Sequence, residues 1–180
     1  MKKVLIISGS PRKNGNTEAM VERFAAGAVE SGHQVEVIHL REKKIGYCVN
    51  CDSCRNNNTD CVINDDAREI VAKALECDVM VLATPVYFYN VTAQLKTLID
   101  RFYAREHEYF TLPERDCYYL FANAGFDHHQ DSTVAVLDGF IAFLRTLKGK
   151  CMVQANRVMY AGDIDNTAYL EQSYEMGKKC

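Results

Sequence analysis

The stretch VLIISGSPRKNGNT (residues 4–17) passes from an apolar run into a polar segment that contains two glycines. The run at residues 4–7 is typical of a fully buried β-strand, and Ser8-Gly9-Ser10-Pro11 ends it. Such a run is too short for the apolar core of a secretory signal and far too short to span a membrane. The stretch therefore predicts the first strand of an α/β fold and the turn that follows it.

Strand-like and helical patterns alternate along the rest of the chain. Further predicted strands cover residues 35–40, 79–83, 118–122 and 151–155. The predicted helices run from the first turn to Gly32, from Asp65 through Leu75, from Leu95 to Phe102, from Val134 through Leu147 to Gly149, and from Thr167 onward. Five alternations predict a parallel sheet with helices on both faces. In such sheets ligands bind beyond the carboxyl ends of the strands.

The composition is that of one globular domain over residues 1–180, with 48% hydrophobic and 25% charged residues. A formal net charge of −3 gives no basis for a nucleic-acid partner, because such binding requires clustered positive charge. We expect no membrane partner and a cytoplasmic location. In a reducing compartment the eight cysteines are expected to be ligands, reactive thiols or core residues rather than disulfides.

The turn after the first strand (residues 8–17) is rich in hydroxyl and amide side chains and has no carboxylate before Glu18. A helix N-terminus carries partial positive charge and favours an anion. We expect Asn16 or Thr17 to cap the helix, and the Ser10 and Thr17 hydroxyls to donate to phosphate oxygens. The spacing fits neither a nucleotide P-loop nor a dinucleotide fingerprint. A single terminal monophosphate is favoured, and a polar loop with ordinary capping is the alternative.

The segment TPVYFYN (residues 84–90) follows the third predicted strand and contains three consecutive aromatic residues. One buried face of a helix or strand does not account for all three. An aromatic surface beside a backbone fixed by Pro85 suits a planar heteroaromatic ring, and a subunit interface is the alternative. Asn123-Ala124-Gly125, at the end of the fourth predicted strand, is expected to close the pocket from the opposite side.

The segments SGSPRKNGNT (residues 8–17) and TPVYFYNVTAQLKTLIDR (residues 84–101) resemble the NAD(P)H-dependent FMN reductase and iron–sulfur flavoprotein branch of the flavodoxin-like superfamily. The resemblance runs over nearly the whole chain. It implies a flavodoxin-like three-layer sandwich with a five-stranded parallel sheet in the order 2-1-3-4-5. It also implies an FMN-dependent oxidoreductase that assembles into a homodimer or homotetramer with flavin sites near the subunit contacts.

The resemblance also assigns site residues by position. The FMN phosphate is assigned to Ser8, Ser10, Arg12, Gly15, Asn16 and Thr17, and the isoalloxazine ring to Pro85, Val86, Tyr87, Phe88 and Asn90, with Asn123 and Gly125 opposite. The loop after the fourth strand departs from the family in being poorer in glycine and threonine. His128 and His129 in this loop are expected to be solvated rather than to approach the flavin or a substrate.

Cys48, Cys51, Cys54 and Cys61 lie close together in one loop, residues 46–64. Three thiolates at C-x₂-C-x₂-C spacing, followed by a fourth, fit one self-contained iron–sulfur site. The pattern resembles that of iron–sulfur flavoproteins, where it carries a [4Fe–4S] cluster. Zinc usually takes two separated C-x₂-C pairs. Zinc, a loop without an intact cluster, and redox-active disulfide chemistry are the alternatives.

These features predict FMN-dependent electron transfer, with the protein acting as a relay between FMN and a [4Fe–4S] cluster and with no side chain serving as nucleophile or general base. One alternative is an NAD(P)H-dependent flavin, quinone or nitro-compound reductase without a cluster, in which the nicotinamide stacks on the flavin. Another is a non-enzymatic flavodoxin-like electron carrier. A small-molecule acceptor or a ferredoxin-like protein is expected as the electron partner.

Overall fold

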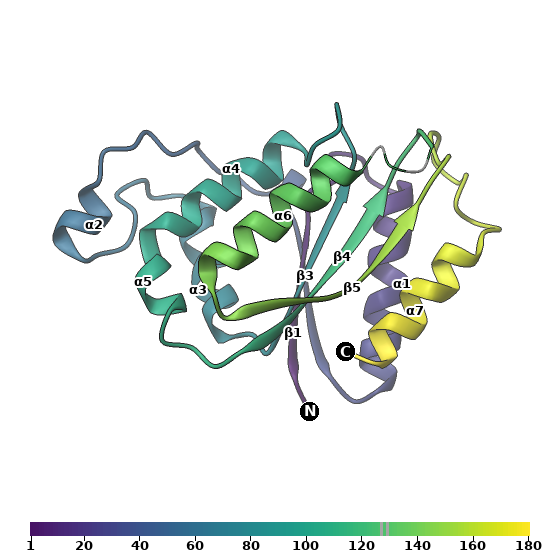
Figure 1. The fold of residues 1–180 in the computed structure, drawn as a ribbon, viewed down its shortest axis with the longest axis horizontal. Coiled ribbons are helices and arrows are strands. Elements are labelled where there is room, and N and C mark those ends of the chain that lie inside the picture. Colours follow the sequence, from purple (N-terminus) through teal and green to yellow (C-terminus); the bar gives the residue numbers. More distant parts are fainter. Residues whose placement is uncertain (127, 129) are drawn as a thin grey trace.

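The computed structural model describes residues 1–126, 128 and 130–180. Its five strands form one parallel sheet in the order β2-β1-β3-β4-β5, which confirms the predicted flavodoxin-like arrangement (Figure 1). The strands are β1 (Lys3–Ser8), β2 (Gln34–His39), β3 (Val79–Pro85), β4 (Arg115–Ala122) and β5 (Leu147–Ala155). Because every strand runs in the same direction, the loops that follow them gather at one edge of the sheet.

Helices cover both faces of the sheet. One face carries α1 (Asn16–Glu30) and α7 (Ala168–Lys178), and the other carries α3 (Asp66–Glu76), α4 (Ala93–Arg101) and α6 (Asp131–Leu144) (Figure 1). Side chains alternate along a strand, so β1 contributes to two separate cores. Val4 and Ile6 pack with α1 and α7, whereas Leu5 and Ile7 pack with α3, α4 and α6.

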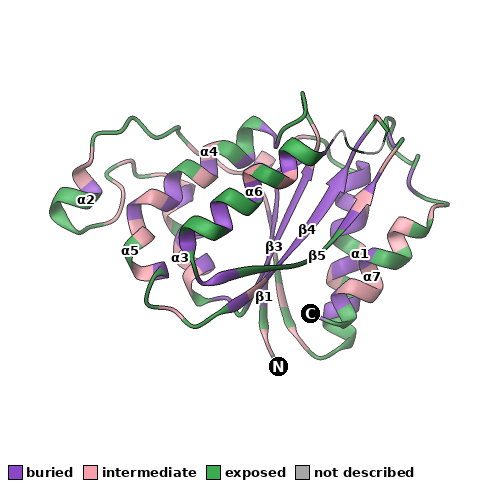
Figure 2. Cartoon of the chain, viewed as in Figure 1, coloured by how far each residue is buried: buried purple, intermediate pink, exposed green. Residues whose placement is uncertain are grey.

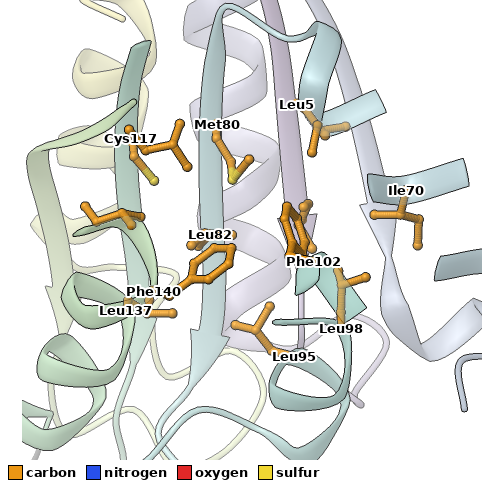
Figure 3. Close-up of a cluster of buried hydrophobic side chains, with 14 of the residues drawn as sticks. Leu5, Ile70, Met80, Leu82, Leu95, Leu98, Phe102, Cys117, Leu137 and Phe140 are labelled. Carbon is orange, nitrogen blue, oxygen red and sulfur yellow. The ribbon is translucent and has the colours of Figure 1, made fainter. Parts of the chain in front are cut away.

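The core beneath α3, α4 and α6 is built from alternate strand positions and the apolar faces of these helices. Figure 3 shows Leu5, Met80 and Leu82 on the strands facing Leu95, Leu98 and other helix residues. The central strands are buried almost throughout, while the helices expose their outer faces (Figure 2). This burial on both faces explains why the strands read as continuous apolar runs in the sequence.

The prediction that a helix extends through Leu147 to Gly149 is wrong. The helix α6 ends at Leu144, where Arg145 adopts a left-handed conformation with φ 63° and reverses the chain. Leu147 therefore begins β5. It is buried in the same core as Leu144, so its apolar side chain continues the spacing of the helical residues although it lies on a strand. Leu40, expected on the second strand, instead begins η1 (Leu40–Glu42).

Besides η1, three short helical elements in the described part of the chain have no counterpart in the sequence prediction: α2 (Ser53–Asn57), η2 (Phe102–Arg105) and α5 (Glu106–Tyr109). The helix α2 lies inside the loop that contains the four clustered cysteines (residues 46–64, the cysteine loop). The element η2 continues directly from the end of α4. No helix in the described part of the chain combines the length and the apolar character needed to cross a membrane.

Candidate functional site

A cleft of about 580 Å³ opens at the carboxyl edge of the sheet, a size typical of small-molecule sites. Its walls come from the loops after β1, β3, β4 and β5. The lining residues are Ser10, Arg12, Gly15, Asn16, Thr17, Pro85, Val86, Tyr87, Phe88, Ala122, Ala124, Val158 and Met159. The structure therefore brings together nine of the predicted cofactor residues, from segments about 70 residues apart in the sequence.

The polar end of the cleft lies at the N-terminus of α1. Gly15 is the N-cap residue, and no side chain among the described residues caps the helix. The prediction that Asn16 or Thr17 caps the helix is wrong, because both lie inside its first turn, where they line the cleft. The first backbone N–H groups of a helix have no partner within the helix, so this end is left to an anion.

Asn16 connects this helix end to the loop after β5. Its Nδ2 donates to the carbonyl oxygens of Val158, at 3.1 Å, and Tyr160, at 2.8 Å. Its Oδ1 is buried and has no hydrogen-bond partner among the described residues. An unpaired buried acceptor is costly, and because Asn16 lines the cleft, a hydroxyl group of a bound ligand would satisfy it.

The loop before α1 is held in place by Glu18. The Glu18 carboxylate lies 2.7 Å from Nη2 of Arg41 and accepts a hydrogen bond from the backbone N–H of Asn14. Burial opposes ionisation, but these hydrogen bonds outweigh it and hold the pKa of Glu18 below its usual value. The carboxylate therefore stays ionised, and Arg41 offsets its charge close to the anion site.

The aromatic end of the cleft is a tight two-residue turn. The backbone of Tyr87 exchanges hydrogen bonds with Asn90, at 2.9 and 3.0 Å, and the two residues between them have positive φ angles, 47° at Phe88 and 61° at Tyr89. Glycine or asparagine is the usual choice in such a turn, and aromatic residues there are strained. The turn nevertheless leaves Phe88 fully exposed at the mouth of the cleft.

Four predicted contacts lie outside the cleft lining: Ser8, Asn90, Asn123 and Gly125. Asn123 is buried, and its Nδ2 donates to Gln130 Oε1 at 3.1 Å and Asn156 Oδ1 at 3.2 Å. It therefore braces the loops after β4 and β5, and the small side chains of Ala122 and Ala124 form the wall.

Val158 and Met159, in the loop after β5, are lining residues that the sequence reasoning missed. The rule that ligands bind beyond the carboxyl ends of parallel strands applies to the fifth strand as well as to the others, and would have indicated this loop. Arg12 ties the two sides together, since its Nη1 donates to the carbonyl oxygen of Met159 at 2.9 Å.

His128 has an exposed side chain, and its Nδ1 lies 3.4 Å from Oδ2 of Asp131 at the start of α6. It is absent from the residues that line the cleft. His129 lies outside the described residues. The expectation that His128 is solvated agrees with this exposure.

The cysteine loop projects beyond α4 and α5 at one end of the molecule (Figure 1). All eight cysteines are free thiols; within the loop Cys54 is buried, Cys61 is half-buried, and Cys48 and Cys51 are exposed. Burial raises the pKa of the Cys54 thiol, and the neighbouring Cys61 and Cys51 thiols raise it further. Within residues 1–126, 128 and 130–180, no group of three or more His, Cys, Asp or Glu side chains converges to hold a metal ion.

Residues 2–144 match the protein family described as NADPH-dependent FMN reductase. An iron–sulfur flavoprotein of Archaeoglobus fulgidus is 44% identical over 99 residues, which cover 55% of this chain and 44% of that protein. The chain spans about half the length of the curated relatives that it matches.

Solved structures with the same fold are more distant in sequence. An azoreductase from Bacillus anthracis superposes with a TM-score of 0.77 at 18% identity, covering 100% of both chains. An FMN-dependent NADH-azoreductase from Bacillus anthracis in complex with FMN gives a TM-score of 0.68 at 16% identity, covering 98% of this chain and 96% of that one. At these identities the likeness concerns the fold alone.

Proposed function

The chain belongs to the NADPH-dependent FMN reductase family, and from that premise we propose that it is an FMN-dependent oxidoreductase whose FMN lies in the cleft at the carboxyl edge of the sheet. The cleft carries this proposal, because its polar end at α1 suits a phosphate and its aromatic end suits a planar ring. When bound, FMN supplies hydride and electron transfer with NAD(P)H as donor.

The described residues fit FMN at both ends. The uncapped first turn of α1, with Ser10 and Thr17, would hold the phosphate group. The buried Oδ1 of Asn16, which has no partner among the described residues, would accept a hydrogen bond from a ribityl hydroxyl. Tyr87 and Phe88 would cover the ring, and Met159 also lines the cleft. An FMN complex in a neighbour of the same fold supports this assignment.

We further propose that Cys48, Cys51, Cys54 and Cys61 bind a [4Fe–4S] cluster. Four free thiols within one loop are the donor set that such a cluster requires, and a relative that is 44% identical is an iron–sulfur flavoprotein. Cys48 and Cys51 are exposed, so the loop must close around the metal as it binds.

A reductase without a cluster is the second candidate function. This function is favoured because, among the described residues, the cysteine side chains do not come together in a group that could hold a metal ion. NAD(P)H would then reduce FMN directly in the cleft, for transfer to a small-molecule acceptor. Assembly into a homodimer or homotetramer, and a ferredoxin-like electron partner, stay predictions.

Protein purified without oxygen is expected to show flavin absorption together with about four iron atoms and four sulfides per chain. Cys61→Ser should remove most of the iron and leave the flavin in place. Cys151→Ser is the matched control, because Cys151 is an exposed cysteine outside the loop. Flavin without iron would leave the cluster-free reductase, and no flavin after addition of FMN would contradict FMN binding.

Phe88→Gly is expected to stabilise the flavin-free protein by about 1 kcal/mol, because glycine adopts a positive φ without strain. The same change should weaken FMN binding several-fold, since Phe88 covers the cleft mouth. Thermal unfolding and a fluorescence titration with FMN measure the two effects.

Tyr160→Gly is the control for Phe88→Gly, because Tyr160 is exposed but does not have a positive φ. It should not stabilise the protein. If Phe88→Gly is less stable than the unmodified chain, the strained turn is not as described here.

A further inference from the structure

One arginine closes the base of the cysteine loop. Arg101, at the end of α4, donates through Nη1 to the carbonyl oxygen of Gly46 at 2.8 Å and to Oδ2 of Asp65 at 2.7 Å. Its Nη2 donates to the carbonyl oxygen of Ile63 at 3.2 Å. Gly46 and Ile63 stand at the two ends of the loop, so a single guanidinium joins them.

Asp65 is the second charged residue of this arrangement, in which Arg101 and Asp65 join Gly46 and Ile63; we call it the clasp. Its Oδ2 also accepts the backbone N–H of Gly46 at 2.8 Å, and its Oδ1 accepts the N–H of Ala67 in the first turn of α3. The Arg101 side chain is 1% exposed, and a buried cation is costly unless it is paired and hydrogen-bonded. The carboxylate and two carbonyl oxygens supply partners for Nη1 and Nη2, whereas Nε is buried without a hydrogen-bond partner among the described residues.

The guanidinium fork is essential to this geometry. It presents several donors at fixed angles, so it reaches Gly46, Ile63 and Asp65 at the same time. A lysine ammonium is a point charge on a flexible stem and does not reproduce such a planar arrangement. Replacing the arginine with lysine therefore keeps the charge and removes the clasp.

The helix α4 also connects the cysteine loop to the cleft. Its N-cap residue, Thr92, donates from Oγ1 to the carbonyl oxygen of Gly9 at 2.7 Å, in the loop that precedes α1. Its last residue is Arg101. Nine residues at about 1.5 Å each give a spacer of about 14 Å. One rigid element thus fixes the cysteine loop relative to the proposed flavin site.

We propose that Arg101 is the positioning residue of the cysteine loop: it holds the two loop ends together and so sets where the four cysteines lie for the proposed metal centre. The part that concerns the metal centre rests on the proposed cluster. The part that concerns loop order does not, because every contact that carries it is made by the chain itself.

The test compares Arg101→Lys with Arg105→Lys. Arg105 follows one helical turn later, pairs with Glu108 and Asp60, and makes no contact with Gly46 or Ile63 that the structure shows. Hydrogen exchange of the metal-free protein reports loop order at the backbone amides of Lys44, Gly46 and Asp66, which are hydrogen-bonded at the loop base. Anaerobic reconstitution with iron and sulfide reports cluster retention by iron content and sulfur-to-iron absorption.

Arg101→Lys is expected to speed exchange at these amides roughly tenfold, the effect of losing a charge-assisted hydrogen bond, and to lower retained iron. FMN affinity should change little, whereas the melting temperature should fall, because lysine leaves the acceptors around this buried position without their full set of donors. Arg105→Lys should change exchange less than about twofold, because lysine keeps the charge and the ion pairs of Arg105 with Glu108 and Asp60 are partly exposed. Equal exchange in the two variants would overturn the inference. If the unmodified protein takes up no iron, the cluster fails, and the exchange comparison still decides the role of Arg101.

Discussion

Replacing Gly27 with alanine is expected to destabilise the fold by about 3 kcal/mol, at the upper end of the usual cost of overpacking. A Cβ at Gly27 would lie 2.1 Å from the carbonyl oxygen of Tyr174 in α7. A Cβ at Gly177 would lie 2.1 Å from the carbonyl oxygen of Phe24 in α1. The two helices cross with their backbones in contact, and no flexible side chain can yield.

Thermal or denaturant unfolding measures this effect, which corresponds to a fall in melting temperature of about 6–12 °C for a domain of this size. Gly139→Ala is the matched control, because Gly139 is an exposed residue within α6 and a Cβ there meets nothing within 4 Å. It should stabilise the protein by up to about 1 kcal/mol through helix propensity. Equal stability of the two variants would contradict the close packing of α1 on α7.

Asn16→Asp is expected to weaken FMN binding at least 100-fold, which corresponds to about 3 kcal/mol. The substitution removes the Nδ2 donor that binds the carbonyl oxygens of Val158 and Tyr160. It also places a carboxylate at the end of the cleft assigned to the phosphate, where like charges repel at a cost of several kcal/mol. A fluorescence titration with FMN measures the change in affinity.

Asn14→Asp separates this local effect from a general change in charge. Asn14 lies two residues earlier in the same loop, is exposed, and does not line the cleft. Aspartate tolerates the positive φ of 56° at this position. We expect Asn14→Asp to bind FMN within a few-fold of the unmodified protein. If the two variants are weakened equally, the phosphate does not lie beside Asn16.

Local patterns in the sequence were enough to predict the strands, most helices and two walls of the cleft. The run at residues 4–7 is buried as β1, and α3 begins at Asp65 and Asp66 as expected, because burial periodicity and helix starts depend on neighbours along the chain. The parallel order then places the loops after β1 and β3 together at one edge.

Other features depend on contacts between distant residues, which periodicity does not encode. Leu147 has the spacing of a helix but lies in β5, because the chain reverses at Arg145 and the same core buries both elements. Gly27 interrupts a good helical pattern without a local reason, and only the crossing of α7 explains it.

The cysteine loop and its clasp show most clearly the difference between what local sequence patterns predict and what the packing of distant residues adds. Spacing along the chain was enough to place four cysteines in one short loop, because it limits which thiols can meet. That Arg101 closes the loop depends on packing, since α4 must bring a residue 55 positions away from Gly46 to its carbonyl oxygen. Met159 reaches the cleft for the same reason. Local chemistry thus specified the elements and their turns, and packing specified which distant side chains complete the sites.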